Sequence, residues 1–126
     1  MEDFLKKEAV KRVQEFITKF DPKLKVLSLD TTARTAKDAA ESLGCEVGAI
    51  VKSLVFRADD TFLICLVSGD KRCSLNKLKK IISKKDVCMA SADEVKVNTG
   101  FSIGGVAPIA HLKKLNILID QSLGKF

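Results

Sequence analysis

The chain has 126 residues, of which 46% are hydrophobic and 30% charged, and its formal net charge is +6. This size and balance predict one folded domain, residues 1–126, and exclude both a disordered chain and a pair of domains. No apolar run is long enough to cross a membrane, and the acidic N-terminus is unlike a signal peptide, so we expect a cytoplasmic protein that does not bind membranes. The positive charge indicates a polyanionic partner.

The first part of the sequence alternates between helical and strand patterns. Apolar residues at three- and four-residue spacings predict an amphipathic helix over residues 3–20, which the Asp-Pro pair at 21–22 ends. We expect a short strand over residues 25–29. A second helix is predicted over residues 35–43, because Thr35 is a favourable N-cap and a glycine follows the last helical residue.

The second part begins with a predicted β-hairpin. Strands over residues 50–56 and 62–67 are separated by a turn at Asp59-Asp60. The later elements are a lysine-rich helix over 74–83, a strand over 87–90, a short helix that begins at a Ser91–Glu94 capping box, and a strand over 115–119. Helices and strands alternate irregularly, so we predict an α/β fold of the α+β type, with helices packed on one mixed sheet.

Lys52 is the unusual residue of the first hairpin strand. Side chains alternate along a strand, which puts Lys52 on one face with Ile50, Leu54 and Phe56. An unpaired ammonium among large apolar side chains is costly. Either Lys52 extends out at an open edge of the sheet, or it lines a pocket that takes an anionic or carbonyl oxygen, and these residues alone leave both interpretations open.

Residues 100–111, GFSIGGVAPIAH, form what we call the glycine loop. It contains the pair Gly104-Gly105, followed by Pro108 and by His111, the single histidine of the chain. Glycine permits close approach to the main chain and proline stiffens it, so the loop can present backbone amides to a polar ligand. The alternative is an ordinary bend between two strands. For His111 we favour a structural hydrogen bond over a general base.

The cysteines and lysines are the remaining residues that could bind a metal, catalyse a reaction or contact a nucleic acid. Four cysteines without a C-x-x-C spacing, in a chain with one histidine, predict neither a metal site nor a catalytic Cys–His pair. The lysines concentrate around the helix at 74–83. They form either a solvated face or a surface that contacts the backbone of a structured RNA.

Three ordered motifs resemble one known family. They are TAKDAAESLGCEVGAIVKSLVF at 35–56, LVSGD at 66–70 and TGFSIGGVAPIAH at 99–111. They are similar to the YbaK/ProX family of freestanding aminoacyl-tRNA deacylases, which are related to the editing domain of bacterial prolyl-tRNA synthetase. The resemblance extends over residues 31–120 and implies a largely antiparallel sheet, curved toward a barrel, with flanking helices. The family continues with another strand and a helix, which this sequence lacks.

The resemblance implies an enzyme that hydrolyses the ester between a wrong, small amino acid (alanine, serine or cysteine) and tRNA for proline. It implies no cofactor, with mischarged tRNA and prolyl-tRNA synthetase as partners, and it maps the family's essential lysine onto Lys52. The expected substrate-binding residues are Ile50, Leu54, Phe56, Ser68, Gly69, Asp70, Ile103, Gly104, Gly105, Val106, Ala107, Pro108 and His111. The expected tRNA-binding residues are Lys77, Lys79, Lys80 and Lys84.

Two other classes of function stay open. A tRNA- or aminoacyl-binding module without catalysis would bind tRNA saturably but would not turn over the ester. A domain that binds a small ligand or a protein would use its lysines only as a solvated surface, and its affinity for tRNA would not depend on salt.

Overall fold

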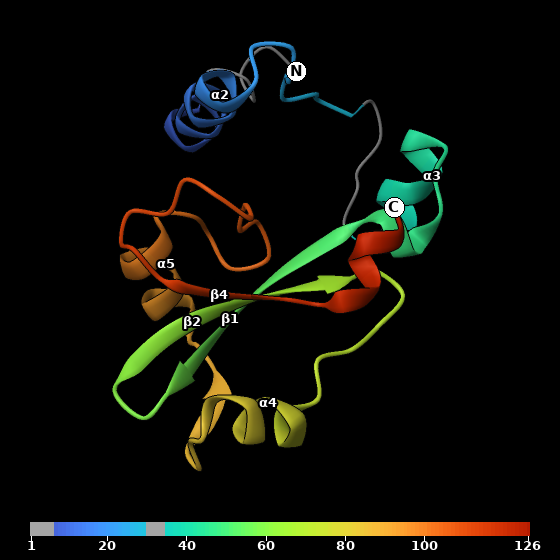
Figure 1. The fold of residues 1–126 in the computed structure, drawn as a ribbon. Coiled ribbons are helices and arrows are strands. Elements are labelled where there is room, and N and C mark those ends of the chain that lie inside the picture. The colour runs from blue at the N-terminus through green and yellow to red at the C-terminus, as the bar shows by residue number, and fades with distance from the viewer. Residues whose placement is uncertain (1–6, 30–34) are drawn as a thin grey trace.

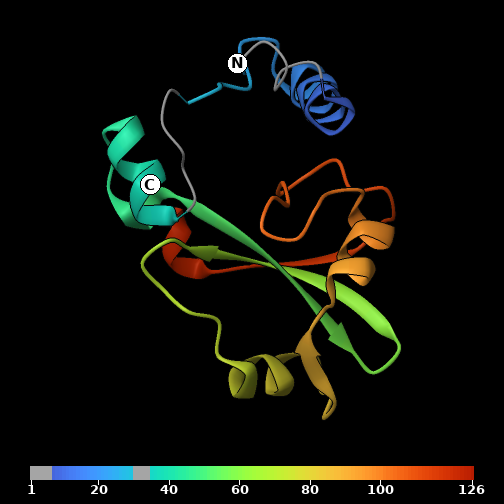
Figure 2. The same cartoon turned by 180° about the vertical axis from the view of Figure 1, so that it is seen from behind.

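The structure is a computed structural model that describes residues 7–29 and 35–126. Its elements, in chain order, are α2 (Glu8–Phe20), α3 (Ala36–Leu43), η1 (Val47–Ala49), β1 (Val51–Ala58), β2 (Thr61–Ser68), α4 (Leu75–Ile82), β3 (Val87–Met89), α5 (Ala92–Thr99), β4 (Asn116–Ile119) and η2 (Gln121–Lys125). Figure 1 shows a twisted sheet at the centre, with α4 on one side and α5 on the other. In the reverse view of Figure 2, as in Figure 1, the glycine loop lies between α2 and the sheet.

The sheet has the strand order β3-β1-β2-β4. β1 and β2 form an antiparallel hairpin whose partners run from Val51 with Ser68 to Ala58 with Thr61. β3 pairs antiparallel with β1 over Phe56–Ala58 alone, whereas β4 runs parallel to β2. The predicted hairpin and the mixed sheet with flanking helices are confirmed, and the sheet is open rather than closed into a barrel.

Each face of the central hairpin packs against its own hydrophobic cluster. On the α4 side, Phe56 belongs to a cluster that includes Leu78. On the α5 side, Val55 and Ile64 pack with Val95. Because both faces of β1 are covered, its odd- and even-numbered side chains lie in two different environments.

The predicted helix ends are confirmed by their caps. The hydroxyl of Thr35 accepts a hydrogen bond from the amide of Asp38 at the start of α3. At the start of α5, the amide of Ser91 donates to Glu94 Oε1 at 2.8 Å, and the amide of Glu94 donates to Ser91 Oγ at 3.2 Å. The hydrogen bond from the Ser91 amide lowers the pKa of the Glu94 carboxyl below its ordinary value. None of the helices in the described ranges is both long and apolar enough to cross a membrane.

The strand expected at residues 25–29 is wrong. The structure has no strand in this segment, which pairs with no strand of the sheet and begins beside α2 instead. The side chain of Gln14 accepts a hydrogen bond from the amide of Val26 at 2.8 Å and donates to the carbonyl of Leu24 at 3.2 Å. A helix side chain thus satisfies backbone groups that a neighbouring strand would otherwise bind. The helix predicted from residue 3 is described from Glu8, and residues 3–6 lie outside the described ranges.

Candidate active site

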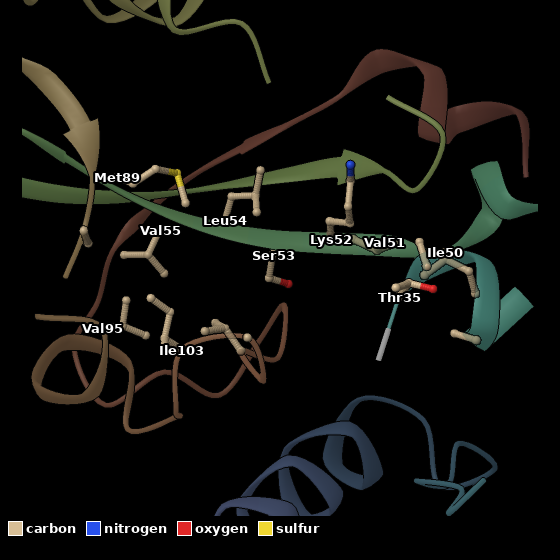
Figure 3. A pocket seen from close by; sticks show the side chains of 15 residues that line it. Thr35, Ile50, Val51, Lys52, Ser53, Leu54, Val55, Met89, Val95 and Ile103 are labelled. Atoms are coloured by element: carbon tan, nitrogen blue, oxygen red, sulfur yellow. The ribbon is translucent and has the colours of Figure 1, made fainter. Parts of the chain in front are cut away.

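Strand β1 carries the candidate site, and its two faces differ in what they meet. Figure 3 shows Ser53 and Val55 pointing toward Ile103 of the glycine loop, whereas Lys52 and Leu54 point the opposite way. This follows from strand alternation, because Leu54 packs against the α4-side cluster and Val55 belongs to the α5-side cluster. The side chains of Lys52 and Ser53 therefore lie on opposite faces of the sheet.

A pocket of about 430 Å³ extends along β1 between the start of α3 and the glycine loop. The predicted site residues that line it are Ile50, Lys52, Leu54, Ile103, Gly104 and Val106. Small side chains such as Ala36 and Ala90 form other parts of its wall. Phe56 was expected in this wall but does not line the pocket, because it is only 2% exposed in the core under α4.

The edge of β1 at this pocket is open. β3 pairs with β1 from Phe56 onward, and the last bond on that side is from the amide of Ala90 to the carbonyl of Val55 at 3.1 Å. Backbone groups also alternate along a strand, so the amides and carbonyls of Val51 and Ser53 point to the side where β3 does not extend. Within the described ranges they have no strand partner there. The pocket thus offers main-chain donors and acceptors from the strand itself.

Lys52 is half-buried, and its ammonium donates a hydrogen bond to the backbone carbonyl of Lys71, in the segment between β2 and α4. The ammonium and the glycine loop consequently lie on opposite sides of β1, although Lys52 is among the residues that line the pocket. A single neutral carbonyl satisfies one of the three N–H groups of an ammonium. Lys52 therefore keeps N–H donors available for an oxygen atom of a ligand near the start of β1.

The glycine loop is closed at its base and contacts the pocket through a few residues. The amide of Leu112 donates to the carbonyl of Thr99 at 3.2 Å, which joins the two ends of the loop. Gly104 has a φ of 83°, a left-handed conformation that glycine adopts readily. Val106 packs against the α5-side cluster and fixes the loop to the sheet. The predicted residues Gly105, Ala107 and Pro108 do not line the pocket.

His111 lies at the end of the glycine loop and not in the pocket. Its Nε2 is 2.7 Å from the carbonyl oxygen of Ala107, four residues earlier in the same loop. Its ring stands edge-on to Phe101, with the ring centroids 6.0 Å apart. These contacts bind one part of the loop to another, the structural role that the sequence favoured.

The motif Ser68, Gly69 and Asp70 lies outside the pocket and supports the segment before β1. The hydroxyl of Ser68 is 2.5 Å from the carbonyl of Gly48 and 2.8 Å from Asp70 Oδ1. A Cβ at position 69 would collide with the carbonyl of Val47, so only glycine fits there. The motif holds η1 against the end of β2 and thereby sets where β1 begins.

Asp120 fastens the same region and was not identified from the sequence. Its carboxylate accepts hydrogen bonds from the amide of Ser122 at 3.0 Å and from the amide of Ser68 at 3.3 Å. The hydrogen bond from Ser122 lowers the pKa of the Asp120 carboxyl below its ordinary value. Ser53 was also missed, and strand alternation was the available signal, since it places Ser53 on the face opposite Lys52.

The predicted tRNA-binding lysines do not all gather in one place. Lys79, Lys80 and Lys84 line one surface depression at the end of α4. Lys84 is also 3.6 Å from the carboxylate of Asp59. Lys77 borders a different groove, which lies between α4 and β4.

The amino-acid sequence of the chain matches one known family and several of its members. A family model described as the aminoacyl-tRNA editing domain matches residues 30–126. The chain is 34% identical over 91 residues to the proline–tRNA ligase of Caldicellulosiruptor bescii, a match that covers 72% of this chain and 16% of the ligase. It is 30% identical over 119 residues to YwhH of Bacillus subtilis, an uncharacterized protein, which covers 94% of this chain and 75% of YwhH. The chain thus spans about a sixth of the length of the ligase.

Solved structures of similar proteins have the same fold as this chain. A crystal structure described as a candidate trans-editing enzyme for prolyl-tRNA synthetase superposes with a TM-score of 0.88 and 39% identity. That superposition covers 95% of this chain and 76% of the other. A second structure, of the hypothetical protein APE2540, superposes with a TM-score of 0.78 and 31% identity over 87% of this chain. The resemblance inferred from the three motifs is confirmed.

Proposed function

Because the chain belongs to the aminoacyl-tRNA editing domain family, we propose that it is a trans-editing deacylase that hydrolyses the ester of a mischarged tRNA. The observation that carries the proposal is the pocket between β1 and the glycine loop, which joins an open strand edge to a left-handed glycine. The editing-domain relatives support tRNA for proline as the nucleic acid, and prolyl-tRNA synthetase as the enzyme whose errors are corrected.

The size and lining of the pocket favour a small amino acid. Its volume of about 430 Å³ is near the lower end of the roughly 300–1,000 Å³ that is usual for ligand sites. The side chains of Ile50, Val55 and Ile103 line the pocket and are apolar, which suits a small side chain such as a methyl or hydroxymethyl group. Alanine, serine and cysteine fit these limits, and a hydrophobic pocket separates them from one another only modestly.

The reaction needs few catalytic groups, since an aminoacyl ester is already reactive. Water adds to the ester carbonyl carbon, the bond to the ribose oxygen breaks, and that oxygen takes a proton, which yields the free amino acid and tRNA. Amides aimed at the carbonyl oxygen stabilise the oxyanion as it forms, and we assign this role to the open edge at Ser53 and to the loop at Gly104.

We assign Lys52 to the negative charge of the substrate. Its ammonium would exchange the neutral carbonyl of Lys71 for the oxyanion or for the terminal phosphate of tRNA, because a charged acceptor makes the stronger hydrogen bond. A flexible four-carbon stem allows that change without movement of the strand.

The function is tested by the release of alanine from alanylated tRNA for proline under single-turnover conditions. The wild-type protein should release alanine, and Lys52→Ala should slow release about 100-fold or more, the usual cost of one lost donor to an oxyanion. Lys71→Ala is the matched control, because it removes a neighbouring ammonium but keeps the carbonyl that Lys52 binds. A wild-type protein without turnover would refute the function, and a folded Lys52→Ala protein at the wild-type rate would refute the role of Lys52.

A further inference from the structure

Arg12 of α2 binds both ends of the glycine loop. Its Nε donates a hydrogen bond to the carbonyl of Ala110 at 2.9 Å, and its Nη2 donates to the carbonyl of Thr99 at 3.3 Å. These two carbonyls are eleven positions apart in the sequence, one just before the loop and one near its end. The planar guanidinium presents its N–H groups in a fixed geometry, so one side chain can hold both carbonyls at once.

The guanidinium also fills a space that the loop leaves for it. It lies over the ring of Phe101, 4.7 Å from the ring centroid, and Phe101 is buried. A Cβ at position 100 would lie 2.6 Å from Arg12 Nη2, so glycine at this position makes room for the guanidinium. The guanidinium therefore occupies a specific binding site rather than making a loose surface contact. The site consists of two hydrogen bonds, a cation–π contact and a glycine opposite the side chain.

The bond to Ala110 stabilises a backbone conformation that is otherwise unfavourable. Ala110 has a φ of 64°, in the left-handed region that alanine rarely adopts. The neighbouring His111 then reaches back to the carbonyl of Ala107, inside the loop. A contact that fixes the orientation of Ala110 therefore fixes the return path of the whole loop.

Arg12 is also the side chain of α2 through which the helix is hydrogen-bonded to the loop. Within the described ranges, α2 has no buried residue, and the hydrogen bonds of Gln14 beyond the helix go to residues 24 and 26 rather than to the loop. Figure 1 shows the loop between α2 and the sheet, so a loop held on one side by Val106 and on the other by Arg12 is fixed from both directions.

We propose that Arg12 is a positioning residue, which holds the glycine loop in the shape that presents Ile103 and Gly104 to the pocket. The consequence for catalysis rests on the proposed deacylase function, whereas the effect on the loop does not. Amides that stabilise an oxyanion must be placed to within a fraction of an ångström, so a loop released at its base should lose rate rather than substrate affinity. The competing role for Arg12 is a contact with a tRNA phosphate. That role predicts a loss of substrate affinity rather than of rate.

The kinetic test compares Arg12→Ala and Arg12→Lys with Lys11→Ala, an exposed neighbour on the same helix that loses the same charge. We expect kcat on alanylated tRNA to fall about tenfold or more in Arg12→Ala, with KM within about twofold of the wild type. Arg12→Lys should fall nearly as far, because an ammonium does not reproduce the planar fork. Millimolar methylguanidinium should restore part of the rate of Arg12→Ala, whereas the same concentration of sodium chloride should not.

A second measurement follows the loop without reference to catalysis. The backbone amide resonances of Gly104 and Gly105 should shift in Arg12→Ala and in Arg12→Lys, and should stay unchanged in Lys11→Ala. If the wild-type protein has no deacylase activity, the proposed function fails while these resonances still decide the proposal about the loop. The proposal is overturned if the glycine resonances do not move, if Arg12→Lys keeps the wild-type kcat, or if the loss in Arg12→Ala lies wholly in KM.

Discussion

Gly104 is the glycine of the loop that lines the pocket, and its backbone conformation favours glycine. Its φ of 83° is unfavourable for a side chain, although a Cβ there would meet no atom within 4 Å. Gly105 is the matched control, since its φ is ordinary and a Cβ would lie 3.6 Å from the carbonyl of Ser102. Gly104→Ala should cost the loop conformation about 1 kcal/mol and lower kcat severalfold, while Gly105→Ala should change neither.

Turnover of alanylated tRNA and the melting temperature of both variants check this prediction. A Gly105→Ala variant that loses more activity than Gly104→Ala would show that backbone strain at position 104 does not control the loop. Equal activity of Gly104→Ala and the wild type would show that the left-handed residue has no part in the reaction.

The residues of the site could be predicted only in part. The sequence singled out Lys52, Ile103 and Gly104, which the structure brings to one pocket. It also placed Phe56 in the wall, because strand alternation alone does not tell which of two buried faces a pocket adjoins. The contact of Lys52 with Lys71, 19 residues away, depends on where the segment after β2 passes, and no local pattern contains that information.

Among the elements, those with strong local signals were predicted best. The N-caps Thr35 and Ser91 marked the starts of α3 and α5, because each cap satisfies an amide within its own helix. Residues 25–29 have strand-like composition, but the structure gives them α2 as a neighbour instead of a strand. The parallel position of β4 beside β2 was not predicted either, since strand pairing is decided by contacts between distant segments.

The basic C-terminal end of α4 is a candidate surface for tRNA. If Lys79 and Lys80 contact tRNA phosphates, affinity should fall steeply with salt, and their joint replacement by alanine should reduce the slope of log affinity against log salt by about 1 for each lost contact. The turnover rate at saturating tRNA should stay unchanged, because these lysines lie away from the pocket.

The matched control is the double variant Lys19→Ala, Lys23→Ala. Replacing these two exposed lysines near the end of α2 removes the same amount of charge. Binding is measured by filter retention of labelled tRNA at several salt concentrations. A wild-type affinity that does not depend on salt, or equal slopes for the two double variants, would identify the α4 lysines as a solvated face.

At the scale of the whole molecule, the fold brings the site together from distant parts of the chain. The pocket joins the start of α3, the open edge of β1 and the glycine loop, while Arg12 reaches the same loop from α2. Class and family could be predicted because composition, caps and three ordered motifs are properties of the sequence itself. The covering of both faces of β1 is a property of the assembled fold, and it decides which side chains face the glycine loop.

A deacylation panel measures whether the assembled pocket removes small amino acids from tRNA. The wild-type protein is mixed with tRNA for proline that carries alanine, serine, cysteine, proline or phenylalanine, and the released amino acid is followed over time. We expect release of one or more of the three small residues and much slower release of phenylalanine, whose larger side chain would have to share the pocket of about 430 Å³ with the end of the tRNA. Stability of all five esters would refute the deacylase function, and release of phenylalanine as fast as alanine would refute selection for small side chains.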